Sequence, residues 1–238
     1  MPEPSAPKPT FLNKVGAEIV GTFLVSATAI SVDVLYYTGE HVDAVSRWLA
    51  RGFITAAVIY AFSETSGAHL DPAVTIGFAL RRVFSLPMTA AYVVAQFAGS
   101  FIAAGLCMLL FGGSQLALGA SHPGPGFSAP VAAATEAVLT FALMLVILMT
   151  AQEQPAVGKT AALAVGFVVA TCGFAAGPIS GASMNPARTI APQILAGTFG
   201  NIWIYVVGPL VGSAIAVAVH AGLSGAPSTA ERKAARGR

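Results

Sequence analysis

Two stretches of this chain decide how it folds: Ser-Gly-Ala-His-Leu-Asp-Pro-Ala-Val at residues 66–74 and Ser-Gly-Ala-Ser-Met-Asn-Pro-Ala-Arg at residues 180–188. Five of their nine positions are identical, at an offset of 114 residues. Asp and Asn are good helix N-caps, and proline suits the first position of a helix. Each stretch is therefore predicted to end in a short helix, one beginning after Asp71 and the other after Asn185.

The repeat extends beyond these two stretches. Glu18 in Ala-Glu-Ile-Val-Gly-Thr-Phe matches Glu136 in Thr-Glu-Ala-Val-Leu-Thr-Phe at an offset of 118, and residues 99–100 match residues 212–213 at an offset of 113. We infer two copies of one unit of three membrane spans. An odd number of spans per unit makes the second copy enter the membrane inverted, which places a shared site at the bilayer midplane.

The composition supports a membrane protein. Of 238 residues, 9% are charged and 55% are hydrophobic, and the mean hydropathy is +0.76. Soluble domains carry about 25% charged residues, so a soluble enzyme is nearly excluded. No charged residue occurs between Arg82 and Glu136. A net charge of +2 offers no basic patch, so no nucleic-acid partner is expected.

Six full helical spans and no strands are predicted, because the apolar runs are long enough to cross a bilayer and lack alternation. The spans are 15–36, 47–66, 88–111, 131–151, 160–177 and 201–221. A signal peptide is the rival interpretation of the first span, and the repeat argues against it.

The chain divides into five parts around these spans. A disordered tail (1–10) precedes the first repeat (11–111), an extracytoplasmic loop (112–130) joins it to the second repeat (131–221), and a basic tail (222–238) follows.

Positive charges predict the orientation. If both tails are cytoplasmic, the inner side holds nine cations and the outer side holds Arg47 and Arg51. The nine are Lys8, Lys14, Arg81, Arg82, Lys159, Arg232, Lys233, Arg236 and Arg238. We therefore expect a multi-pass protein of the plasma (inner) membrane with both termini in the cytoplasm.

The two short helices are too short to cross the membrane, so each is predicted to dip in from its own side. Irregular backbone at that depth is tolerated only where it lines a cavity. The carbonyl groups of residues 66–70 and 180–184 would then line one cavity, with the positive ends of both half-helices meeting at its centre.

With these features the sequence resembles the major intrinsic protein family, the aquaporins and aquaglyceroporins, over about residues 11–221. The wording of residues 177–188 is most similar to the bacterial and nodulin-26-like branch. The resemblance implies six helices plus two half-helices, a homotetramer in the lipid bilayer, and one pore per subunit for water and small uncharged solutes such as glycerol, urea, and boric or arsenous acid. The implied pore-motif residues are Asp71, Pro72, Ala73, Asn185, Pro186 and Ala187.

The resemblance also implies a selectivity filter, formed by Arg188, Gly173, Ala182 and Arg51. Gly173 and Ala182 are small and indicate a wide filter. Arg51 stands where an aromatic or small residue is common. It could instead extend to the outer headgroups, with Phe53 or Gly52 nearer the pore. Two cations at one pore would repel each other unless Asp33 or Asp43 lay near.

Asp71 departs from the family pattern, which usually has Asn at this position. An ionised carboxylate only accepts hydrogen bonds and attracts cations. Two alternatives follow: a pore that still excludes ions, or one with some cation or proton leak.

Buried carboxylates in a membrane are functional candidates by default. In the family, residues at the positions of Glu18 and Glu136 brace the re-entrant loops, and His69 is given a similar bracing role. We expect no catalytic residues, metal site or cofactor, and therefore no enzyme. The alternatives are a secondary transporter with broken helices and a non-conducting adhesion or scaffold protein.

Overall fold

The structure is a computed structural model that describes residues 8–151 and 158–237. Over these residues it is a bundle of long helices. The six long helices are α1 (Phe11–Thr38), α2 (Ala44–Ser66), α4 (Leu86–Phe111), α6 (Ala129–Thr150), α7 (Gly158–Ser180) and α9 (Ile204–Ser224).

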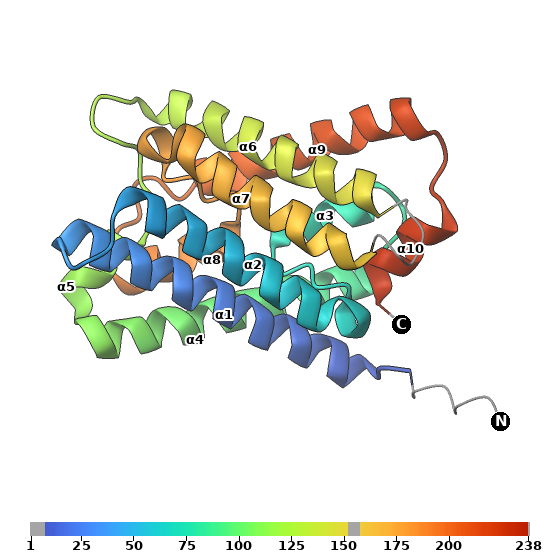
Figure 1. The fold of residues 1–238 in the computed structure, drawn as a ribbon, viewed down its shortest axis with the longest axis horizontal. Coiled ribbons are helices and arrows are strands. Elements are labelled where there is room, and N and C mark those ends of the chain that lie inside the picture. The colour runs from blue at the N-terminus through green and yellow to red at the C-terminus, as the bar shows by residue number, and fades with distance from the viewer. Residues whose placement is uncertain (1–7, 152–157, 238) are drawn as a thin grey trace.

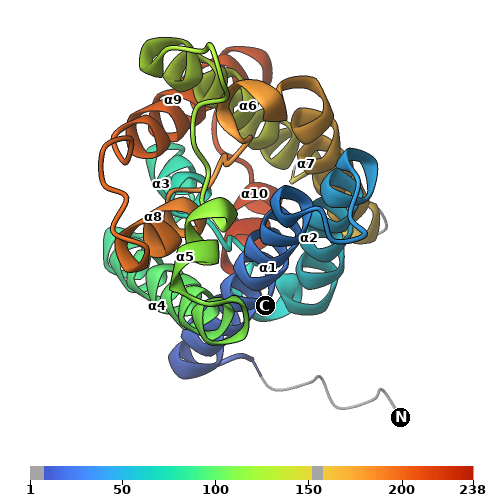
Figure 2. The same ribbon diagram turned by 90° about the vertical axis from the view of Figure 1, so that its left-hand side faces the viewer.

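The shorter elements are the two half-helices α3 (Pro72–Leu80) and α8 (Pro186–Leu195), the connecting α5 (Gly113–Leu116) and η1 (Ala117–Gly119), and the final α10 (Thr229–Arg236). The long helices run side by side, and the beginning of α1 and the final helix α10 lie at the same end of the bundle (Figure 1). Viewed along the helices, the long helices surround the centre of the molecule, and α3 and α8 lie between α4 and α9 (Figure 2). The predicted fold, with six spans, two half-helices and an inverted repeat, is confirmed.

The two repeats use the same close helix contacts. Helix α1 packs on α4, and α6 packs on α9 in the equivalent way. A Cβ atom added at Gly99 would lie 2.3 Å from the carbonyl oxygen of Ile19, and one added at Gly212 would lie 2.1 Å from that of Ala137. The backbones therefore touch at these glycines, as is common where membrane helices cross.

The two repeats meet at a third glycine contact, between α2 and α7. A Cβ atom at Gly52 would lie 2.6 Å from the carbonyl oxygen of Gly166, and the reverse distance is also 2.6 Å. Glycine at both positions lets the first and second repeats approach closely enough to enclose one shared cavity.

Five of the six long helices (α1, α4, α6, α7 and α9) are long and apolar enough to cross a membrane, judged over the described residues. Helix α2 has a similar length of 23 residues but includes Arg47, Arg51 and Glu64. Both arginines are buried inside the bundle, so they do not face lipid.

Two segments that the sequence analysis treated as irregular contain short helices. The loop of residues 112–130 contains α5 and η1, and the tail of residues 222–238 contains α10. Helix α10 is an amphipathic helix capped by Ser228, whose hydroxyl accepts a hydrogen bond from the Glu231 amide.

The glycine contacts give a first prediction. Gly99→Ala should lower the melting temperature, because overpacking against a backbone carbonyl costs about 1–3 kcal/mol, more than the ~1 kcal/mol that alanine adds to helix propensity. Gly105→Ala on the same helix is the matched control, because a Cβ atom there meets nothing within 4 Å. Thermal unfolding in detergent measures both variants. A Gly99→Ala protein as stable as the Gly105→Ala protein would contradict the packing described here.

Candidate functional site

One cavity of about 1100 Å³ has six of the thirteen predicted site residues in its wall. Asp71 and Asn185, from the two half-helix stretches, both line it. Arg51, Ala182 and Arg188 line it as well, and so do residues of α10 such as Lys233. Residues more than 100 positions apart in the sequence thus border one space, as the inverted repeat predicts.

The half-helices begin as their sequence signals indicate. The Asp71 carboxylate accepts a hydrogen bond from the Ala73 amide (2.7 Å), and the Asn185 side-chain oxygen accepts one from the Arg188 amide (3.2 Å). Pro72 and Pro186 stand at the start of α3 and α8. These caps leave the positive ends of both helices directed at the middle of the bundle.

The two half-helices are also linked to each other and to the bundle. The side-chain Nδ2 of Asn185 donates to the Leu70 carbonyl (2.9 Å), which connects the second motif to the loop before the first half-helix. Ala73 accepts a hydrogen bond through its carbonyl from the Ser213 hydroxyl (2.8 Å), and Ala187 is fully buried.

Glu18 lies beneath the first re-entrant loop and binds its backbone. The carboxylate accepts hydrogen bonds from the Ser66 hydroxyl (2.7 Å), the His69 amide (3.0 Å) and the Leu70 amide (2.8 Å). Gln96 donates a further one from its side chain (2.8 Å). Inside the hydrocarbon layer these donor groups have no water to bind, so each one left without a hydrogen-bond partner would cost free energy of folding.

Glu136 repeats this arrangement in the second half. It accepts hydrogen bonds from the Ser180 hydroxyl (2.7 Å), the Ser183 amide (2.9 Å) and the Met184 amide (2.7 Å). These hydrogen bonds from the loop to a buried carboxylate stabilise a loop backbone conformation that is otherwise unfavourable. Ala68, Leu70, Ala182 and Met184 all have positive φ angles between 42° and 57°, a region that non-glycine residues seldom adopt.

His69 lies beside the first loop among three aromatic rings, those of Phe78, Phe84 and Tyr92. Its Nδ1 is 3.1 Å from the Thr75 hydroxyl, and its Nε2 is 2.8 Å from the Ala235 carbonyl. A carbonyl oxygen can only accept, so Nε2 carries the hydrogen. The imidazole therefore connects the re-entrant loop to α10, a contact that the sequence analysis did not foresee.

Two tyrosines that the sequence analysis missed complete the bracing. The Tyr92 hydroxyl donates to the Ser66 carbonyl (2.8 Å), and the Tyr205 hydroxyl donates to the Ser180 carbonyl (2.7 Å). Their offset in sequence is 113, the same as that of the matched Gly99 and Gly212. Extending the repeat at that offset would have found them.

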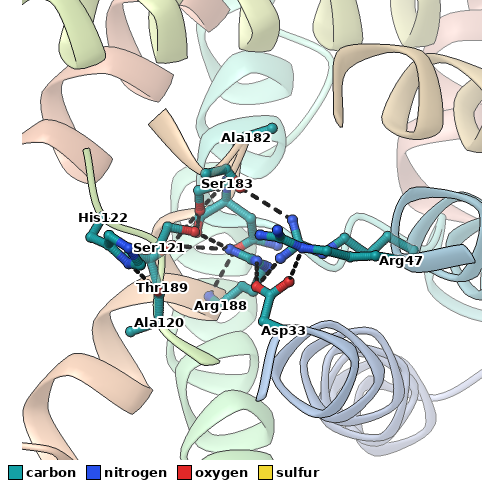
Figure 3. Close-up of polar contacts among 12 residues, drawn as sticks. Asp33, Arg47, Ala120, Ser121, His122, Ala182, Ser183, Arg188 and Thr189 are labelled. Atoms are coloured by element: carbon teal, nitrogen blue, oxygen red, sulfur yellow. Dashed lines mark hydrogen bonds and ion pairs between the residues drawn. The ribbon is translucent and has the colours of Figure 1, made fainter. Parts of the chain in front are cut away.

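Three arginines converge on one carboxylate at one end of the cavity, and we call Asp33, Arg47, Arg51 and Arg188 the arginine cluster. Arg47 donates to Asp33 Oδ1 (2.6 Å), while Arg188 (3.1 Å) and Arg51 donate to Oδ2. Arg47 and Arg188 approach the carboxylate from different sides (Figure 3). All four side chains are at least 94% buried. Of the two acidic residues proposed from sequence, Asp33 therefore pairs with the arginines.

The remaining contacts of the cluster fix its arginines across the end of the cavity. Arg51 Nη1 donates to the Gly181 carbonyl (3.2 Å), in the loop that precedes α8. Arg188 Nη1 donates to the Ser121 hydroxyl (2.5 Å), in the connection after η1. Arg51 is 4% exposed, whereas Phe53 on the same helix is 59% exposed. The arginine thus points inward and the phenylalanine outward.

Trp48 occupies the space that the glycine at position 173 leaves open. A Cβ atom added at Gly173 would lie 2.2 Å from Cε3 of the indole. The same ring packs against the guanidinium groups of Arg51 (4.5 Å) and Arg47 (4.3 Å), which are cation–π contacts. No motif singled out Trp48, although it lies one helical turn before Arg51.

Comparison with known proteins agrees with this geometry. The chain matches the family described as major intrinsic protein over residues 5–220. Aquaporin NIP1-3 of Oryza sativa subsp. japonica is 41% identical over 207 residues, which covers 85% of this chain and 71% of that protein. Nodulin-26 of Glycine max is 39% identical over 207 residues, which covers 85% of this chain and 74% of that protein.

A solved structure supports the fold. The X-ray structure of the aquaglyceroporin from Plasmodium falciparum superposes with a TM-score of 0.81 at 24% identity, covering 89% of this chain and 96% of that one. The resemblance drawn from the sequence, including its nodulin-26-like wording, is confirmed. The chain is a multi-pass membrane protein that belongs to the major intrinsic protein family, which is a family of channels.

Proposed function

We propose that this protein is a passive channel whose narrowest point is the arginine cluster, so that water passes faster than glycerol. A passive pore for water and small uncharged solutes is what its family membership and fold support. One observation carries the finer proposal: Arg51 and Arg188 both line the cavity that also contains Asp71 and Asn185. Two guanidinium groups offer donors to a passing oxygen and repel cations.

The filter is narrower than Gly173 and Ala182 suggest on their own. Trp48 packs against Gly173, which does not line the cavity, whereas Arg51 does line it and reaches from α2 to the loop carbonyl of Gly181. We therefore propose that water has the highest permeability, and that Arg51 limits the permeability to glycerol, urea and boric or arsenous acid. Transport is down a gradient and involves no catalytic step, which distinguishes the protein from a secondary transporter and from an enzyme.

We further propose an inner-membrane homotetramer with both termini in the cytoplasm. The excess of cations on the tails supports the orientation, and the beginning of α1 and α10 lie at one end of the bundle (Figure 1). Apolar side chains exposed on the long helices, such as Val94 and Leu109 on α4, suit contact with lipid or neighbouring subunits.

Arg51→Ala should convert the channel to one that passes glycerol freely. In proteoliposomes measured by stopped-flow light scattering, the parent should shrink rapidly after a sucrose step and re-swell slowly after a glycerol step. The variant should re-swell rapidly, because removing the guanidinium widens the filter. Phe53→Ala is the matched control on the same helix and should behave as the parent. Rapid re-swelling of the parent, or none in Arg51→Ala, would contradict the assignment of Arg51.

Asp33→Asn should destabilise the protein strongly. Removing one partner of a buried ion pair leaves uncompensated charge and costs about 3–5 kcal/mol, and here three guanidinium groups lose their shared carboxylate. Asp43→Asn is the control, because Asp43 caps α2 at an exposed position and asparagine caps equally well. Thermal unfolding should show a large decrease for the first variant and almost none for the second. Equal melting temperatures would mean that Asp33 is not the carboxylate that holds the cluster.

Asp71→Asn should leave the proton permeability at the background level that we also expect of the parent. The arginine cluster and two half-helix N-termini present positive charge along the path, which opposes the entry of cations whatever the state of Asp71. A pH-sensitive dye inside proteoliposomes measures the flux under a pH step, with empty liposomes as the reference. A parent flux above background that Asp71→Asn abolishes would establish the leak alternative.

A further inference from the structure

We propose that α10 is an autoinhibitory helix that docks in the cytoplasmic mouth of the pore and limits flux until it undocks. The inference rests on the proposed channel function and adds its regulation. Viewed along the bundle, α10 lies across the central region that the long helices surround (Figure 2). Ala230, Lys233 and Ala234 of this helix line the same cavity as the pore motifs.

Helix α10 contacts the conducting backbone itself. The Ala235 carbonyl accepts the hydrogen bond from His69 Nε2 (2.8 Å) in the first re-entrant loop. A Cβ atom at Gly67 would lie only 2.7 Å from that same carbonyl oxygen, so the loop and α10 touch backbone to backbone. Ala235 is fully buried in this contact. A helix that served only as a surface tail would not need to reach the loop that lines the pore.

An ion pair anchors the beginning of α10. Arg81, at the end of α3, donates to Glu231 from Nε (2.9 Å) and from Nη2 (3.2 Å), and its Nη1 donates to the Gly225 carbonyl (2.9 Å). Both charged side chains are at least 95% buried. This paired geometry is directional, and it fixes α10 to the half-helix whose other end caps at Asp71.

Further polar contacts anchor the end of α10. Arg232 and Arg236 donate to the carbonyl groups of Arg82 (3.1 Å) and Val83 (3.1 Å), in the connection after α3. Lys14 of α1 donates to the Arg236 carbonyl. The helix is thus held from α1, from the α3–α4 connection and from the re-entrant loop.

The nature of these contacts makes the helix separable from the bundle. Only Glu231 and Ala235 of α10 are buried, so ion pairs and hydrogen bonds rather than apolar burial hold it. Eight residues are too few to stay helical alone in water, so undocking and unfolding occur together. Gly225, with φ of 72° and no contact near its Cβ position, provides the joint after α9.

Removing the helix is the direct test. We expect a chain truncated after Gly225 to show up to about a tenfold higher water permeability per channel than the full chain, which corresponds to an undocked fraction of about one tenth. Channel number per liposome is quantified in both samples, and melting temperature checks that the shortened protein is folded. A folded truncated protein with unchanged or lower permeability would overturn the inhibitory role.

A charge exchange tests the docking without deleting residues. Arg81→Glu and Glu231→Arg should each raise the permeability towards the truncated value, and the double exchange should restore the parent value because the pair re-forms. Glu40→Arg, at an exposed carboxylate on the α1–α2 connection, is the control for altered net charge. Single variants that behave as the parent would overturn the proposal.

The two proposals fail in different ways. Water flux at the empty-liposome level in both the full and truncated proteins would overturn the channel function and the gate with it. Flux above that level that is the same in both proteins would overturn the gate alone. A second readout is independent of flux. Ser63 on α2 lines the cavity. A membrane-impermeant thiol reagent applied from the α10 side should modify the thiol introduced by Ser63→Cys faster in the truncated protein than in the full chain. Equal rates would argue against docking at the mouth.

Discussion

The structure depends on one constraint: backbone groups inside a bilayer need hydrogen-bond partners, and helices supply them only to themselves. Residues 67–71 and 181–185 leave helical geometry at mid-depth, so their amides need other acceptors. Glu18 and Glu136 supply these acceptors from the first helix of the same repeat, each binding two consecutive amides. The strained positive φ angles of both loops persist because these carboxylates fix the surrounding backbone.

Close packing then brings the two braced loops to a common cavity. Glycine contacts within each repeat and between α2 and α7 let the backbones touch, and this places the Asn185 amide within reach of the Leu70 carbonyl. The inversion of the second repeat opposes the two half-helices, so their positive ends add at the centre. A neutral polar solute meets donors and acceptors along this path, whereas a cation meets positive potential.

The two ends of the cavity are governed by different electrostatic arrangements. At one end, Asp33 pairs with three buried guanidinium groups and offsets part of their mutual repulsion, which leaves the cluster with net positive charge. That arrangement is geometrically fixed, because Trp48, the Gly181 carbonyl and the Ser121 hydroxyl hold the arginines on their other sides. At the other end, the Arg81–Glu231 ion pair and a set of hydrogen bonds anchor an eight-residue helix with little apolar burial. The first end suits a permanent filter, and the second suits a contact that can be broken.

The six spans, the inverted repeat, the two half-helices and the positions of Glu18 and Glu136 could all be predicted from the sequence, because each occurs twice or has a local signal in composition and capping. Which distant residues contact one another depends on the tertiary structure. Trp48 fills the space at Gly173, and α10 returns to the loop of His69. Neither contact has a counterpart in the other repeat or a periodic pattern. Contacts between distant residues leave no such trace in one sequence, because only the packed backbone sets which side chains share a space.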